Sequence, residues 1–175
     1  RDQSYQPSDG YISGFFQTLP VNIDENQTVI NGYELTAYEE YIDNQVLTLS
    51  FFAKAANSLG DDDVKISDRL YLPSRKLRGF ETGKIGPKDG GDYVGGNFLS
   101  AFNAQANLPV MQSFETIDLS IFYDAANVWG VDYNSSINDS SALRSSTGLA
   151  IDWYTPIGPL SFSFSQPLTK KSSDK

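Results

Sequence analysis

The residues of this chain best suited to a defined chemical task are the four of the segment Leu77-Arg78-Gly79-Phe80. Arg78 lies between an apolar residue and a glycine, in a stretch rich in glycine and charge. Arginine is permanently charged and presents a rigid fork of donors, so it suits one carboxylate partner in a confined place. The segment therefore predicts an ion-pair anchor. The alternative, for so short a motif, is a solvent-exposed arginine in an ordinary loop.

The residue types argue against catalysis and metal binding. The chain of 175 residues has no cysteine and no histidine, so the usual general base and the commonest metal ligands are absent. The acidic run Asp61-Asp62-Asp63 lacks the 12-residue pattern of a calcium-binding EF-hand, and we interpret it as a solvated loop. Asp89-Gly90-Gly91-Asp92 receives the same interpretation. We expect no enzyme activity, no metal site and no cofactor.

Charge and hydropathy narrow the class of protein further. The net charge of -9 argues against a nucleic-acid partner, which needs a basic surface. No apolar run approaches the roughly 20 residues of a membrane-spanning helix, and no signal peptide opens the chain. The mean hydropathy of -0.35 is nevertheless compatible with a transmembrane β-barrel, because only alternate residues of its strands need to be apolar.

Alternation of apolar and polar residues predicts an all-β chain built as an antiparallel meander of about seven strands. The expected strands cover residues 11–19, 28–42, 47–54, 97–108, 116–129, 145–154 and 160–165. No segment shows a convincing helical period.

The alternation also assigns faces to the last three strands. We expect one set of large apolar side chains to point outward to lipid: Leu119, Ile121, Tyr123, Leu149, Ile151, Phe162 and Phe164. We expect the opposite, polar set to point inward: Asp124, Asp152, Ser161 and Ser163. A register slip of one residue would reverse every assignment.

The connections are short at residues 41–45, 109–113 and 155–159, and long at 58–94 and 130–143. Short turns at one end and long loops at the other are typical of an outer-membrane barrel. Aromatic residues near strand ends would suit its interfacial girdle: Tyr123, Trp129, Trp153 and Tyr154. Alternation alone fits a soluble antiparallel sandwich equally well.

A family resemblance supports the barrel. The string LRGFETGKIGPKDGGDYVGGN resembles the sixth extracellular loop of the BamA-type outer-membrane assembly factors, the bacterial surface-antigen family. The turn at 5–10, the segment 122–129 and the pair of segments within 148–168 are similar to the family's (Y)xPxDG, FxDxGxxW and GxxxxWxxPxGP patterns. The resemblance covers essentially the whole chain. It implies that 1–175 is a partial C-terminal transmembrane barrel domain, about strands nine to fifteen of sixteen.

The same resemblance implies what the loop and the protein do. The loop at about 58–94 would fold into the barrel lumen, where Arg78 would pair with Asp124. Gln105 stands where the family has a glutamate, and Ala126 replaces a usual glycine. The implied function is the folding and insertion of β-barrel proteins into the bacterial outer membrane. The implied partners are unfolded outer-membrane protein clients, accessory assembly lipoproteins and outer-membrane lipid. The alternatives are the pore of a related secretion or translocation system and a soluble secreted β-sandwich binding module.

Overall fold

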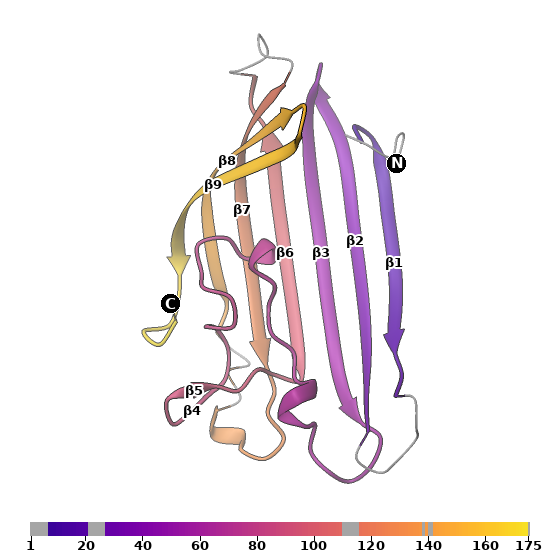
Figure 1. Ribbon diagram of the computed structural model, residues 1–175, viewed down its shortest axis with the longest axis vertical. Coiled ribbons are helices and arrows are strands. Elements are labelled where there is room, and N and C mark those ends of the chain that lie inside the picture. Colours follow the sequence, from indigo (N-terminus) through magenta and orange to yellow (C-terminus); the bar gives the residue numbers. More distant parts are fainter. Residues whose placement is uncertain (1–6, 21–26, 110–115, 138, 140–141, 175) are drawn as a thin grey trace.

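A computed structural model describes residues 7–20, 27–109, 116–137, 139 and 142–174. Seven strands form one antiparallel sheet in which each strand pairs with its neighbour along the chain, except that β3 pairs with β6 across a long connection (Figure 1). They are β1 (Gly10–Thr18), β2 (Thr28–Ile42), β3 (Gln45–Ser58), β6 (Phe98–Asn107), β7 (Ile117–Trp129), β8 (Arg144–Thr155) and β9 (Gly158–Thr169). The predicted seven-stranded meander is confirmed. Because these strands belong to a single sheet, the sandwich alternative is wrong.

The connection between β3 and β6 contains structure that the sequence did not reveal. It runs over residues 59–97 rather than 58–94, and it includes the small hairpin of β4 (Lys88–Asp89) and β5 (Asp92–Tyr93). The segment Asp89-Gly90-Gly91-Asp92, interpreted from the sequence as a solvated loop, forms the turn of this hairpin, and Gly90 there has a φ of +61°. Strands of two residues are too short to show an alternation.

Helical structure in the described residues is limited to single turns. The 3₁₀ turns there are η1 (Ile66–Asp68), η2 (Ser74–Lys76) and η4 (Ser135–Ile137). No helix in the part of the chain that the structure describes is long and apolar enough to cross a membrane.

The sheet is curved, and the β3–β6 connection packs against its concave face (Figure 1). The buried core lies between the two. The connection contributes Val64, Leu70, Leu72, Leu77 and Ile85, and the sheet contributes Phe52, Ala56, Leu99, Ala101, Ala126 and Val128. Complete burial of a large apolar side chain is worth about 1.5–3 kcal/mol, so this cluster holds the connection firmly to the wall. At Gly96 a side chain is excluded, because a Cβ atom would lie 2.5 Å from the carbonyl oxygen of Trp129.

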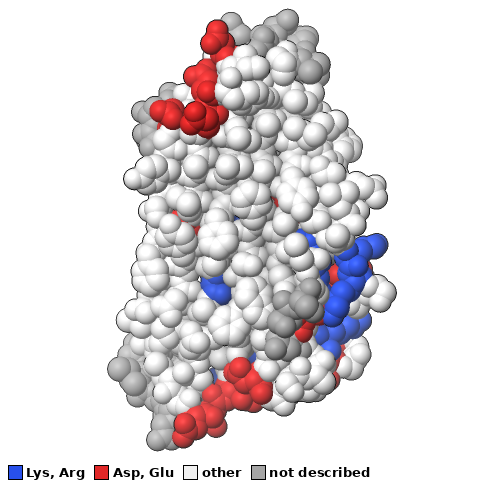
Figure 2. Space-filling view, turned by 180° about the vertical axis from the view of Figure 1, so that it is seen from behind, with Lys and Arg blue, Asp and Glu red and all other residues white. Residues whose placement is uncertain are grey.

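The two faces of the sheet divide as predicted. Ile121 is 47% exposed, whereas Asp124 is fully buried. The pairing of Leu149 with Phe164 and of Asp152 with Ser161 carries the same faces onto β8 and β9. Seen from behind, the middle of the convex face is almost free of charged residues, and acidic residues gather at its two ends (Figure 2). This is the surface expected where a barrel wall meets lipid.

The predicted aromatic girdle is only partly present. Trp153 lies on the outer face near the end of β8 and is 44% exposed, and Trp129 stacks on Phe98 near the end of β7. Tyr154 follows Trp153 directly, so it points inward and lines a cavity. Tyr123 lies in the middle of β7. Two of the four girdle assignments are therefore wrong.

The connections group by length at the two ends of the sheet. The β3–β6 and β7–β8 connections lie at the lower end in Figure 1, and the short β2–β3 and β8–β9 turns lie at the upper end. The expected short turn at 109–113 lies outside the described residues except for its first residue, as do the first two residues of the turn at 5–10.

Candidate functional site: an arginine lock inside the sheet

The backbone on either side of Arg78 aims its side chain at the sheet. The η2 turn ends one residue before Leu77, which is 1% exposed and anchors the loop in the core. Gly79 follows with a φ of +91°, a conformation that side-chain-bearing residues rarely adopt. Burying Leu77 on one side of this bend turns Arg78 toward the polar inner wall of β6 and β7.

Arg78 binds Asp124 through a two-pronged ion pair. Its Nε donates to Asp124 Oδ2 at 2.8 Å, and its Nη2 donates to Asp124 Oδ1, also at 2.8 Å. The backbone N–H of Arg78 donates to the same Oδ2 at 3.0 Å. The side chain of Asp124 is fully buried, and that of Arg78 is 19% exposed. Paired charge-assisted hydrogen bonds of this geometry fix orientation as well as adding energy.

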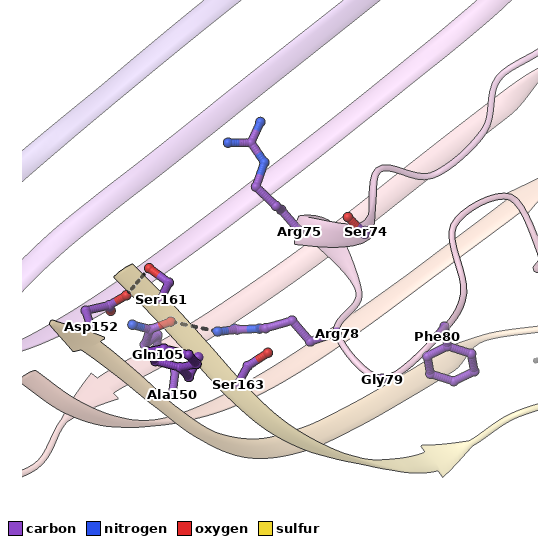
Figure 3. A pocket seen from close by; sticks show the side chains of 11 residues that line it. Ser74, Arg75, Arg78, Gly79, Phe80, Gln105, Ala150, Asp152, Ser161 and Ser163 are labelled. Atoms are coloured by element: carbon purple, nitrogen blue, oxygen red, sulfur yellow. Dashed lines mark hydrogen bonds between the residues drawn. The ribbon is translucent and has the colours of Figure 1, made fainter. Parts of the chain in front are cut away.

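Gln105 takes the third side-chain bond of Arg78. Its Oε1 accepts from Nη1 at 3.0 Å, a contact drawn as a dashed line in Figure 3. The structure thus brings together the three residues that the sequence singled out. Gln105 supplies an acceptor without charge, so Asp124 is the carboxylate that balances Arg78.

Two further residues complete the site and were missed from the sequence. Asn103 donates through Nδ2 to Asp124 Oδ1 and to the carbonyl oxygen of Lys76, each at 2.9 Å. The ring of Phe122 lies under the guanidinium, with its centroid 3.4 Å from Cζ of Arg78. Both occupy inward positions two residues from Gln105 and Asp124, so the period of the strands could have indicated them.

The loop also reaches β9. A Cβ atom at Gly79 would lie 2.9 Å from Oγ and 3.2 Å from Cβ of Ser165. Phe80, beside it, packs against the core cluster. The loop therefore bridges the concave side of the sheet from β6 and β7 to β9, and we call the contacts of Arg78 with Asp124 and Gln105 the arginine lock.

A cavity of about 430 Å³ lies between the loop and the wall (Figure 3). Its lining includes Arg75, Gln105, Asp152, Ser161 and Ser163, so the inward residues predicted on β8 and β9 face this space. Among the described residues, no group of three or more carboxylates is placed to hold a metal ion. The arrangement holds the loop against the wall through an ion pair.

The comparisons with known proteins agree with this geometry. The profile of the Omp85 superfamily domain matches the chain over residues 1–175. This chain belongs to the Omp85 superfamily. Its seven-stranded sheet is part of an outer-membrane β-barrel of the BamA type, one that the fragment does not close by itself.

Three relatives illustrate the match. The outer membrane protein assembly factor BamA of Neorickettsia risticii is 33% identical over an alignment of 139 residues, which covers 75% of this chain and 18% of that protein. BamA of Nitratidesulfovibrio vulgaris is 30% identical over 175 residues, covering 95% of this chain and 21% of that protein. The crystal structure of Haemophilus ducreyi BamA lacking POTRA domains 1–3 superposes with a TM-score of 0.88 at 25% identity, over 99% of this chain and 38% of that one.

The chain thus spans about a fifth of the length of these curated Omp85 relatives. The parts of the barrel that this chain itself supplies are seven wall strands and the loop held by Arg78.

Proposed function

We propose that this chain is the lock-bearing part of an outer-membrane assembly factor that folds and inserts β-barrel proteins. The observation that carries the proposal is the partly buried ion pair between Arg78 and Asp124 on the inner wall of an Omp85 barrel. Relatives that share this wall are named outer membrane protein assembly factors.

Each surface of the sheet has a part in this function. The apolar convex face meets outer-membrane lipid, and the polar concave face receives the loop. β1 and β9 are the edge strands of the sheet, and their outer backbone groups pair with strands supplied by the rest of the barrel. A barrel whose seam opens offers such unpaired groups to an incoming strand, and main-chain hydrogen bonds then template the client.

The arginine lock contributes rigidity. A loop fixed to β6 and β7 and in contact with β9 keeps this stretch of wall in one curvature while the seam opens elsewhere. The task consists of strand pairing and lipid contact, so it needs no catalytic nucleophile, metal or cofactor. Its partners are unfolded outer-membrane proteins and, by analogy with relatives, accessory assembly lipoproteins.

The test replaces the full-length protein in a strain that can be depleted of it. Variants Arg78→Ala and Asp124→Ala are compared with Arg75→Ala, which removes an exposed arginine of the same loop. We expect the first two to lower the amount of folded outer-membrane proteins, scored by heat-modifiable mobility on gels, and Arg75→Ala to leave it unchanged. Wild-type amounts in both lock variants, with the variant proteins present at normal level, would contradict the proposal.

A further inference from the structure

A fully buried arginine lies on the same inner wall that Arg78 contacts, nearer the rim that carries the long loops. Arg144 is the first residue of β8 and pairs across the strands with Ala126, two residues beyond Asp124. Its side chain is fully buried. A charge with no access to water needs partners for all its donors.

Arg144 has a partner for each of its five N–H groups. Nε and Nη2 donate to the two carboxylate oxygens of Asp174 at 2.9 and 3.0 Å. Nη2 also donates to Asp139 at 2.6 Å. Nη1 donates to Asn127 at 2.7 Å and to the carbonyl oxygen of Ala142 at 2.9 Å. The guanidinium is therefore saturated, and we call Arg144, Asn127, Asp139 and Asp174 the rim clasp.

The rim clasp joins three separate segments. Asn127 is near the end of β7, Asp139 belongs to the β7–β8 connection, and Asp174 lies beyond β9. Lys171 adds two contacts to the cluster. Its backbone N–H donates to Asp174 Oδ2 at 2.7 Å, and its Nζ forms an ion pair with Asp139. Two cations and two carboxylates balance within the cluster. The segment after β9 is thus held to the rim by three almost wholly buried charges, Arg144, Asp139 and Asp174, and by the exposed Lys171.

The same segment touches the arginine-bearing loop. The hydroxyl of Tyr93, in β5, donates to the carbonyl oxygen of Ser173, the residue before Asp174. Burial, with the nearby charge of Asp174, raises the pKa of Tyr93. The phenol therefore stays protonated and keeps its donor at neutral pH.

We propose that Arg144 is a positioning residue that holds the β4–β5 hairpin of the loop as well as the segment after β9. The arginine lock fixes the loop at Arg78, and the rim clasp fixes its β4–β5 hairpin through Tyr93 and Ser173. The loop is then held at two points, and the segment after β9 cannot leave the rim without releasing the hairpin. This coupling requires only the barrel fold and stands apart from the proposed assembly function.

Limited trypsin digestion of the purified full-length protein in detergent micelles tests the coupling. Lys84 reports on the loop beside the hairpin, and Lys171 reports on the segment after β9; both are exposed. Cleavage rates at the two lysines are measured by mass spectrometry, and heat-modifiable mobility verifies that the barrel is folded. Proteolysis of a folded protein follows the population that opens locally.

Two substitutions separate the coupling from simple local loosening. Asp174→Asn removes a charge from the rim clasp, and we expect cleavage to accelerate at least about tenfold at both lysines. Tyr93→Phe leaves the clasp intact, and we expect about fivefold faster cleavage at Lys84 alone. The matched controls are Asp43→Asn, in the exposed β2–β3 turn, and Tyr41→Phe, whose hydroxyl donates to a backbone carbonyl at the opposite end of the sheet.

Cleavage that accelerates only at Lys171 in Asp174→Asn would overturn the proposal, because the clasp would then hold its own segment and no more. Unchanged cleavage at Lys84 in Tyr93→Phe would overturn it too, and this variant decides the matter if Asp174→Asn fails to fold. The result expected under the proposal is loss of loop protection in both variants with barrel mobility unchanged. Asp174→Glu, which keeps the carboxylate, should restore protection at both lysines.

Discussion

Arg78→Ala should destabilise the seated loop by about 2–3 kcal/mol. Breaking a fully buried ion pair costs about 3–5 kcal/mol, because the remaining charge is left uncompensated. Here the cost is reduced, since Arg78 is 19% exposed. Asp124 would also keep two donors, the backbone N–H of residue 78 at 3.0 Å and Asn103 Nδ2 at 2.9 Å.

The measurement is a urea titration of the full-length protein in lipid vesicles. The folded barrel is scored by its electrophoretic mobility before boiling, and the change in midpoint multiplied by the slope gives the free energy change. Arg75→Ala is the control, because it removes an exposed arginine from the same loop. We expect this control to change the free energy of unfolding by less than about 0.5 kcal/mol.

A double-mutant cycle measures whether Arg78 and Asp124 stabilise the loop through one shared interaction. Asp124→Ala should cost at least as much as Arg78→Ala, since it leaves Arg78 and Asn103 without their shared acceptor. The double variant, Arg78→Ala with Asp124→Ala, should lose no more stability than the more harmful single variant, because each substitution already removes the same ion pair. Strictly additive losses, or an Arg78→Ala midpoint equal to that of Arg75→Ala, would show that the ion pair does not stabilise the loop.

Three further predictions concern the faces of the sheet, its packing and the arginine lock. Ile121→Arg, at an outward position, should cost about 2–4 kcal/mol near the bilayer midplane, whereas Ser163→Arg should be tolerated; equal tolerance in the urea titration would reverse the face assignment. Gly96→Ala should cost about 1–3 kcal/mol, because its Cβ would lie 2.5 Å from the Trp129 carbonyl oxygen, and Gly91→Ala, which meets nothing within 4 Å, should leave the same midpoint unchanged. Gln105→Glu should stabilise the loop by about 1 kcal/mol, because a carboxylate accepts from Arg78 more strongly than an amide does; an unchanged or lower midpoint would show that a second acid does not help.

The strands could be predicted because each separates lipid from a polar interior, which imposes a period of two. The signal fails where side chains are small. β3 continues to Ser58, four residues beyond its predicted end at 54, through a stretch with two alanines that shows little alternation. Ala56 in that stretch is 1% exposed and packs under the loop, a burial that depends on tertiary contact.

Arg78, Asp124 and Gln105 could be predicted from the sequence, whereas Asn103 and Phe122 could not. The family resemblance implied that the loop enters the lumen, and the inward position of Asp124 on its strand then made this carboxylate the partner expected for Arg78. Phe122 contacts the guanidinium and Asn103 donates to Asp124, yet many inward residues share their type and parity. The rim clasp was missed for a different reason: Asp174 lies beyond the last strand, where no strand period assigns its side chain to a face, and only the fold of the segment after β9 brings it to Arg144.

A disulfide between the loop and the wall would show directly that the loop is seated on the inner face of the sheet. The 175 residues contain no cysteine, so Gly79→Cys and Ser165→Cys would introduce a defined pair. A Cβ atom at position 79 would lie 3.2 Å from that of Ser165, within a few tenths of an ångström of disulfide geometry, which needs about 3.5–4.5 Å. The strained backbone at Gly79 makes a cysteine there cost about 1–2 kcal/mol, no more than we expect the arginine lock to supply.

The pair is introduced into the full-length protein in the outer membrane, and cross-linking is read from the gel mobility of the protein with and without reductant. Gly79→Cys with Ser161→Cys is the control, because Ser161 lies on the same face four residues away, about 13 Å along the strand. We predict a disulfide for positions 79 and 165 and none for 79 and 161. Free thiols at 79 and 165, or equal cross-linking of the two pairs, would contradict the seated loop.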